Sequence, residues 1–391
     1  MFKSRHLLIA DISGYTKFLA ETELAHAKGI LEDHFDASLP VFKVPVKISG
    51  LRGDAVFSYA IDDDIVSNQF ILDVTDKNYG AFAEKKDHIK INTTCSCAAC
   101  QSMGDLDLKV FIHHGEFAFQ KSGNTEELAG TDVITLFRLM KNDVVEKTGI
   151  NAYALITQDA VNKMDVGEFF SKDSYHTASY EHIGEVGYFI KDLKKTWEEK
   201  RDTTRIYVSE EDDLLVDEVS ISIPISPEAA FTMYSQPDYR QQIDEADELE
   251  IFNKKGNVID AGSQYHCHHG KQVFKFEILD YRPGEYMTVI VRLPMKMSIK
   301  QTVDFIPNDE GSIVKLRYSQ IEYENFAGKM MSKIMAPKLQ KMLGHALETV
   351  SANLVKVSTN LLENNPDLGV SNDIASKSID IKEAVDLKLA S

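Results

Sequence analysis

The chain has 391 residues, 43% of them hydrophobic, which is enough for two or three domains with separate cores. Its formal net charge of −18 argues against a general nucleic-acid binder and against attraction of the whole protein to anionic membranes, while leaving room for a local basic patch. The first apolar stretch is too short for a signal peptide or a membrane span, so we expect a cytoplasmic protein without a membrane span.

The first informative segment runs from Ala10 to Thr16. It follows the apolar run at 7–9, which predicts a buried strand that ends near Asp11, and Gly14 then allows a sharp turn into helical residues 17–34. A carboxylate at the end of a buried strand is a candidate metal ligand. The alternative is that Asp11 only caps the helix.

A hairpin is predicted next, from strands at 44–49 and 55–59 that turn at Gly50 and Gly53. Asp54 then lies at the tip of the hairpin, either as a second metal ligand or as a residue that stabilises the turn. Two carboxylates on neighbouring tips can hold two hard divalent cations.

This pair of segments, at this spacing, resembles the class III adenylate/guanylate cyclase domain. The resemblance implies a two-ion site for magnesium or manganese, with Asp11 and Asp54 as ligands and the Ile12 carbonyl assisting. It also implies a nucleoside triphosphate substrate, whose ribose 3′-hydroxyl attacks the α-phosphate and releases pyrophosphate.

After a predicted helix at 65–85, an insertion near 92–104 carries Cys95, Cys97 and Cys100. Three thiols within six residues can converge on one zinc ion, and the fourth ligand could come from His88, Cys267 or a partner chain. An iron–sulfur centre, a redox switch, or small residues in a turn are the alternatives. The strand 106–114 follows, and we expect Gly115 to turn it into a hairpin.

A third segment, from Gly130 to Leu139, occupies the place of the cyclase helix whose Asn and Arg reach the substrate from the partner subunit. The resemblance makes Arg138 the catalytic arginine, whereas Ile134 stands where the family has its asparagine. Glu127 falls on a base-binding position, and Gly50 replaces the usual lysine, so the recognised base stays open. Arg138 could instead be a solvated residue on an amphipathic helix.

The pattern restarts beyond a charged stretch at 196–213, which we expect to be a linker. A strand near 216–223, a helix that begins at Ser226, several alternating strands over 250–318 and a long amphipathic helix at 326–357 follow. This order resembles the START-like, polyketide-cyclase-related (SRPBCC) helix-grip fold. That resemblance implies a cavity for a lipid-like or aromatic ligand, and methionines at 295, 297, 330, 331, 335 and 342 would line either this pocket or an ordinary core.

The sequence therefore predicts an α+β protein: a cyclase-like, ferredoxin-type α/β sandwich at 1–195, the linker, a helix-grip domain at 214–358 and a flexible tail at 359–391. We expect a signalling nucleotidyl cyclase that is coupled to a small apolar ligand in its second domain. Because one chain carries one copy of each cyclase segment, the resemblance implies a homodimer. The alternative is an inactive nucleotide-binding or ligand-sensing scaffold, so the sequence leaves enzymatic activity open.

Overall fold

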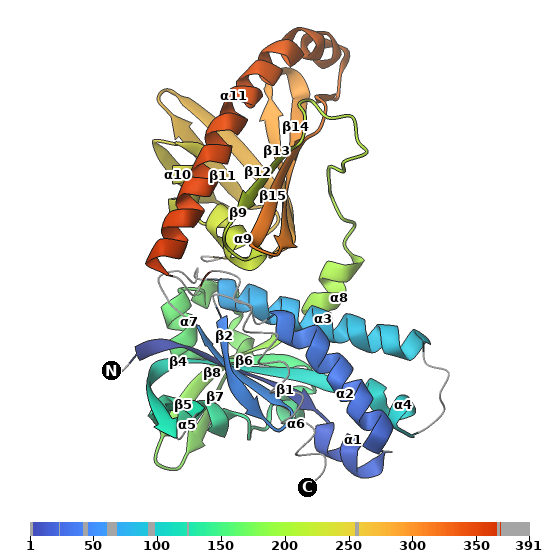
Figure 1. Ribbon diagram of the computed structural model, residues 1–391, viewed down its shortest axis with the longest axis vertical. Helices are drawn as coiled ribbons and strands as arrows, with labels where there is room; N and C mark the ends of the chain where they lie inside the picture. Colours follow the sequence, from blue (N-terminus) through green and yellow to red (C-terminus); the bar gives the residue numbers. More distant parts are fainter. Residues whose placement is uncertain are drawn as a thin grey trace. The chain divides into compact units, whose positions relative to one another are not determined.

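The computed structural model describes residues 3–22, 24–41, 46–60, 69–92, 98–122, 125–254, 258–365 and 368. The chain forms two compact units, and the boundary between them lies between Thr203 and Thr204. Each unit is built on one β-sheet with helices packed against it (Figure 1). The predicted α+β class is therefore confirmed.

The first unit has a mixed sheet with strand order β2-β3-β1-β4-β6-β8-β7, and β5 pairs with β4 outside this order. Its strands are β1 Lys3–Ser13, β2 Val46–Arg52, β3 Ala55–Ala60, β4 Asp107–Ser122, β5 Thr125–Ala129, β6 Tyr153–Thr157, β7 Tyr175–Tyr180 and β8 Gly184–Asp192. Its helices are α1 Tyr15–Glu21, α2 Leu24–Ser38, α3 Phe70–Asn92, α4 Ala98–Ser102, α5 Thr131–Leu139, α6 Val144–Thr148, α7 Gln158–Met164 and α8 Leu193–Asp202.

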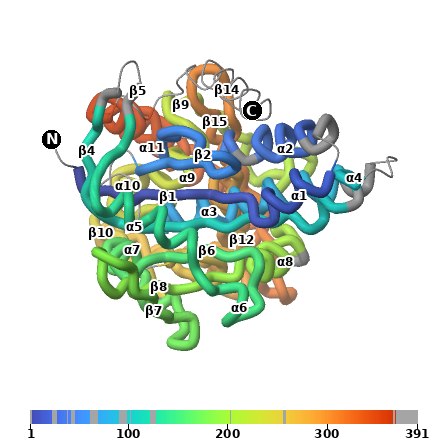
Figure 2. The backbone as a smooth tube through the Cα atoms, turned by 90° about the horizontal axis from the view of Figure 1, so that it is seen from below, coloured from blue at the N-terminus to red at the C-terminus, as the bar shows by residue number. Residues whose placement is uncertain are grey.

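Strand β1 runs through the middle of this sheet, between β3 and β4 (Figure 2). Leu7, Leu8 and Ile9 are fully buried because helices cover both faces of the sheet there. Side chains of a strand alternate between its faces, so Leu7, Ile9 and Asp11 share one face. The apolar run therefore forms the buried strand that the sequence predicts.

The two faces of the sheet are covered by different helices. Ile9 lies in register with Phe111 of β4, and both belong to a core that includes Val133 and Leu136 of α5. On the opposite face Lys191 of β8 pairs with Asp76 of α3. The face that carries Asp11 is thus the one that α5 covers.

Gly115 has a different role from the one predicted. Strand β4 continues through this residue to Ser122, and the hairpin partner β5 begins at Thr125. A Cβ atom at Gly115 would lie 2.3 Å from the Asp132 side chain, which accepts a hydrogen bond from the Glu116 amide. The glycine is required because the N-terminus of α5 lies directly against the strand.

The second unit has an antiparallel sheet with strand order β10-β11-β12-β13-β14-β15-β9, and β16 pairs with β14. Its strands are β9 Val219–Ile223, β10 Glu248–Phe252, β11 Gln264–His269, β12 Gln272–Arg282, β13 Tyr286–Leu293, β14 Met297–Asn308, β15 Gly311–Tyr318 and β16 Glu322–Tyr323. Its helices are α9 Pro227–Ser235, α10 Pro237–Asp244 and α11 Phe326–Asn364. Helix α11 lies across the sheet (Figure 1) and extends beyond the predicted end at 357, into the segment expected as a tail.

The methionines of the second unit divide between core and surface. Met297 is buried, and Met331 and Met335 of α11 pack against it together with Leu339. Met295, Met330 and Met342 are exposed instead. Of the methionines that were predicted to line a pocket or a core, Met297, Met331 and Met335 thus belong to an ordinary apolar core on one side of α11.

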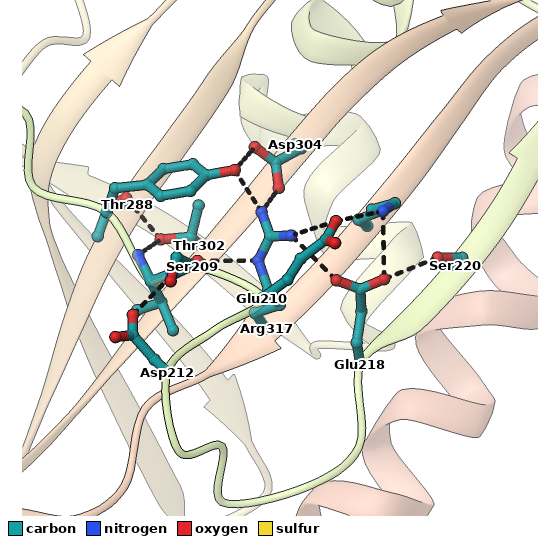
Figure 3. A network of polar contacts seen from close by, with 12 residues as sticks. Ser209, Glu210, Asp212, Glu218, Ser220, Thr288, Thr302, Asp304 and Arg317 are labelled. Atoms are coloured by element: carbon teal, nitrogen blue, oxygen red, sulfur yellow. Dashed lines mark hydrogen bonds and ion pairs between the residues drawn. The ribbon is translucent and has the colours of Figure 1, made fainter.

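The segment expected as a linker is part of both units. Residues up to Asp202 belong to α8, and the segment after Thr204 is hydrogen-bonded to the second sheet. Arg317 of β15, only 1% exposed, holds it: the guanidinium donates to the Val208 carbonyl (2.8 Å) and to the Glu218 carboxylate (2.9 Å), and it pairs with Asp304 (Figure 3). The charged stretch that the sequence predicts to be a linker is therefore folded against the second sheet, where it contacts the buried Arg317.

No helix in the described ranges combines the length and the apolar character that a membrane crossing needs.

Candidate active site

Asp11 lies near the end of β1, just beyond the last β1–β3 pair, Ala10 with Val56. The chain then turns at Gly14, whose φ of 87° lies in the left-handed region, and α1 begins at Tyr15. The predicted strand, turn and helix are all present. They leave the Asp11 carboxylate near the C-terminal end of β1, where it is partly buried.

Asp54 lies in the two-residue turn between β2 and β3. Gly53 precedes it with a φ of 75°, which a residue with a side chain rarely adopts. Gly50, which was also expected to turn the chain, lies inside β2 opposite Phe57, next to a bulge. The tip therefore consists of Gly53 and Asp54 alone.

The two carboxylates are close enough to repel one another. Burial and, to a smaller extent, the negative charge of Asp11 together raise the pKa of Asp54 to about 7. Burial also raises the pKa of Asp11, against the opposing effect of Lys109. No ion pair within 4 Å neutralises either carboxylate among the described residues. Repulsion between two carboxylates of this kind is unfavourable, and a bound cation would neutralise their charge.

Lys109 and Tyr153 extend this site across the sheet. Lys109 of β4 lies directly opposite Asp11 in the ladder, and its ammonium is 5.5 Å from the centre of the Tyr153 ring of β6. On the other side, the pKa of Tyr15 is raised by burial and by the charge of Asp54. The sequence did not single out Lys109, because only the register of β1 against β4 brings it to Asp11.

The donor set fits a hard divalent cation. Magnesium is commonly held by one or two carboxylates together with the phosphates of a substrate, and Asp11 and Asp54 would provide the two carboxylates. The described residues contain no group of three or more His, Cys, Asp or Glu side chains arranged around a metal ion. Asp11, Asp54 and the Ile12 carbonyl would therefore need oxygens from a substrate or from water to complete the coordination.

The raised pKa of Asp54 predicts a pH dependence of stability. Without metal, the folded protein keeps this proton up to about pH 7, whereas the unfolded chain loses it near 3.8, so the contribution to stability is lost as the pH rises between these values. We expect Asp54→Asn to melt at a higher temperature than the wild type at pH 8 in EDTA, by a few degrees, and to show a smaller difference at pH 5. Thermal unfolding at the two pH values tests this, and a variant less stable than the wild type at pH 8 would contradict it.

Glu127, the predicted base-binding residue, is paired with Arg52 at 2.9 Å. Arg52 ends β2, two residues before Asp54, so the structure brings Glu127 of β5 to the same hairpin. Both side chains are about half exposed, and a pair of this kind contributes only about 0–1 kcal/mol. It can therefore open without a large loss of stability.

Arg138 lies on the outer face of α5, near its end. Val133 and Leu136 point into the core, while Ile134 is 55% exposed and Arg138, one turn later, is also exposed. No carboxylate within 4 Å pairs with Arg138 in the part of the chain that the structure describes. Its position on α5 thus leaves it available to another molecule.

Cys100 is the one member of the predicted cysteine cluster that lies among the described residues. Cys95 and Cys97 lie outside the described residues, and Cys100 is half-buried in α4. Cys267 belongs to the second unit, where its thiol is 3.9 Å from the Asp244 carboxylate and burial raises its pKa to about 12. The role of Cys267 as a fourth zinc ligand stays a prediction.

Comparison with known proteins gives one family model and one curated relative. The family model, described as "Protein of unknown function (DUF2652)", matches residues 36–148. An uncharacterized protein of Mycobacterium tuberculosis is 30% identical over 149 residues, which are 38% of this chain and 66% of that protein. The chain thus covers just under two thirds of the length of this relative.

Solved structures similar to this chain include nucleotide cyclases. The guanylyl cyclase Cya2 is 12% identical and aligns over 49% of this chain and 92% of its own, with a TM-score of 0.37. A bacterial light-regulated adenylyl cyclase is 10% identical over 50% of this chain and 99% of its own, also with a TM-score of 0.37. A Staphylococcus aureus protein of unknown function, SA2116, is 16% identical over 38% of this chain and 94% of its own, with a TM-score of 0.30.

Proposed function

We propose that this protein is a nucleotidyl cyclase that uses magnesium or manganese at Asp11 and Asp54. The observation that supports this most directly is the pair of neighbouring carboxylates, both with raised pKa values and neither in an ion pair with another described residue. A structural aspartate in a turn gains nothing from a second carboxylate beside it, whereas two carboxylates side by side are an arrangement in which a divalent cation is commonly bound.

The proposed reaction joins the ribose 3′-oxygen of a nucleoside triphosphate to its α-phosphorus. The bond from that phosphorus to the bridging oxygen breaks, pyrophosphate leaves, and the hydroxyl proton passes to water. The metal supplies positive charge that balances the phosphates when it is bound. Lys109 adds a fixed positive charge beside Asp11, where the triphosphate would lie, and Tyr153 holds its ammonium in place by a cation–π contact.

Arg138 would act from a second chain. It is on the face of α5 that points away from the core of its own unit, so a homodimer with two-fold symmetry would place it opposite the carboxylates of the partner. A guanidinium suits this role because its planar set of donors matches phosphate oxygens.

The activity itself is tested with the full chain and the four common nucleoside triphosphates, each with Mg²⁺ or Mn²⁺. We expect pyrophosphate and a 3′,5′-cyclic nucleotide in equal amounts from at least one of them. Thermal unfolding with the same mixtures measures binding independently, since a ligand that binds only the folded state raises the melting temperature. The proposal would be refuted if no triphosphate gave turnover and none gave a thermal shift.

A mixed dimer tests the role of Arg138. Arg138→Ala and Asp54→Asn should each be inactive alone, and co-expression with two different tags allows the heterodimer to be purified. In that dimer one site combines an intact carboxylate pair with an intact arginine, so we expect about half the wild-type activity. A heterodimer as inactive as its parents, or a strict monomer in light scattering, would remove the action in trans.

The second unit would couple this activity to a small ligand. A groove of about 600 Å³ lies between the segment that leads into β9 and helix α11. Its walls are formed by Leu215, Val216, Asp217, Val219, Gln340, Gly344, Leu347, Glu348 and Ser351. The volume suits a ligand of drug or lipid-fragment size, and the apolar side chains favour an apolar or aromatic one.

A second candidate function is a nucleotide-binding scaffold without turnover. Ile134 favours it, because an exposed isoleucine stands where a cyclase has the asparagine that steadies the ribose, and its side chain can donate no hydrogen bond. The two functions are separated by the experiment above: the scaffold gives a metal-dependent thermal shift with a triphosphate but no pyrophosphate.

A further inference from the structure

The first half of α11 carries an exposed row of large apolar side chains. Phe326, Met330 and Ile334 are spaced four residues apart, and their exposed fractions are 76%, 57% and 69%. The opposite side of the same helix packs into the core through Met331, Met335 and Leu339. The exposed row therefore does not belong to the core of the unit.

We call Phe326, Met330 and Ile334 the α11 apolar patch. A row of large apolar side chains that stays exposed on a protein surface commonly marks an interaction site.

Lysines border the patch. Lys329, Lys333, Lys338 and Lys341 are all exposed, and none is within 4 Å of a carboxylate among the described residues. At 100° per residue, Lys329 and Lys333 lie on one side of the apolar row and Lys338 on the other. The sequence from Asn325 to Leu347 contains no aspartate or glutamate, in a chain whose net charge is −18.

We propose that the α11 apolar patch docks on the surface of an anionic lipid bilayer. An exposed apolar row with lysines on both sides is the pattern of a helix that lies in the membrane interface, where the apolar side chains enter the acyl boundary and the lysines contact anionic headgroups. Helix α11 cannot cross the membrane, so it would lie along the surface. A second copy fits the patch less well, because an isologous contact would bring the two sets of lysines together.

The test uses the full chain and sedimentation with vesicles of phosphatidylcholine, with or without about 30% phosphatidylserine. We expect binding to the anionic vesicles, weaker binding at 0.5 M salt because the lysine contribution is screened, and little binding to neutral vesicles. Lys329→Ala together with Lys333→Ala should weaken partitioning about 25-fold, at about fivefold for each lysine. Met330→Ser together with Ile334→Ser should abolish it at every salt concentration tested.

Matched controls come from the other end of the same helix. Lys356 and Val355 are exposed there, outside the patch, and Lys356→Ala and Val355→Ser should leave vesicle binding unchanged. All of these positions are exposed, so the melting temperatures should stay within a few degrees of the wild type.

Three results would overturn the proposal. One is wild-type protein that stays in solution with anionic vesicles, and another is equal loss of binding in the patch and control variants. The third is wild-type protein that does not bind vesicles but associates with itself or captures an acidic protein. The Met330→Ser and Ile334→Ser changes would abolish that association.

Discussion

Replacing Asp54 by asparagine is expected to lower the metal-dependent release of pyrophosphate by about three orders of magnitude. The change keeps the size and shape of the side chain but removes one of the two charges that would hold the cation, and lost metal stabilisation of several kcal/mol corresponds to about this factor. The variant should remain folded, because Asp54 lies at a hairpin tip where asparagine is well tolerated. Initial rates of pyrophosphate release, at saturating Mg²⁺ or Mn²⁺, measure the effect.

Asp173 provides the matched control for this experiment. It is an exposed aspartate of the same unit, away from the carboxylate pair in the strand order, and Asp173→Asn should have wild-type activity. We also expect Mg²⁺ to raise the melting temperature of the wild type, and this increase should be lost in Asp54→Asn and retained in Asp173→Asn. Equal rates for the wild type and Asp54→Asn would show that the carboxylate pair does not carry the chemistry.

Replacing Arg317 by alanine is expected to destabilise the second unit by about 3–5 kcal/mol, because it removes the cation that pairs with the buried Asp304 carboxylate. Asp304 is only 6% exposed, and Glu218 and the Val208 carbonyl would also lose the guanidinium (Figure 3). A change of this size lowers the melting temperature by roughly 10 °C for a unit of this length. Calorimetry should show the shift in the transition of the second unit.

Arg292 is the control for Arg317. It also pairs with a carboxylate, that of Glu277, but its side chain is 62% exposed. Arg292→Ala should therefore cost less than about 1 kcal/mol. Arg317→Lys should fall between the two, since an ammonium keeps the charge but cannot donate in the planar arrangement of the guanidinium. Similar losses for Arg317→Ala and Arg292→Ala would show that the buried network contributes little.

The local parts of the candidate site could be predicted from the sequence. An apolar run, an aspartate and a glycine specify a buried strand that ends in a turn, because these preferences act between neighbouring residues. The same holds for the hairpin with Gly53 at its tip and for the long helix that begins at Phe326. Asp11 and Asp54 could be named in advance for this reason.

Other features depend on pairing between distant segments. Lys109 reaches Asp11 only through the register of β1 against β4, and a shift of one residue would place it on the other face of the sheet. Gly115 looks like a turn residue in the sequence, but its role comes from the close approach of Asp132 on α5. Sequence spacing carries no information about either contact.

Helix α11 shows the same division within one element. Its apolar residues at helical spacing predict the helix, yet they occupy two sides of it, and the spacing does not say which side is buried. The tertiary structure decides this by packing Met335 and Leu339 against the sheet and leaving Met330 and Ile334 exposed. The sequence by itself thus determined the local elements and the two aspartates, whereas the partners of each charge and the exposed apolar patch followed from long-range packing, because contacts between distant residues form only when the whole chain folds.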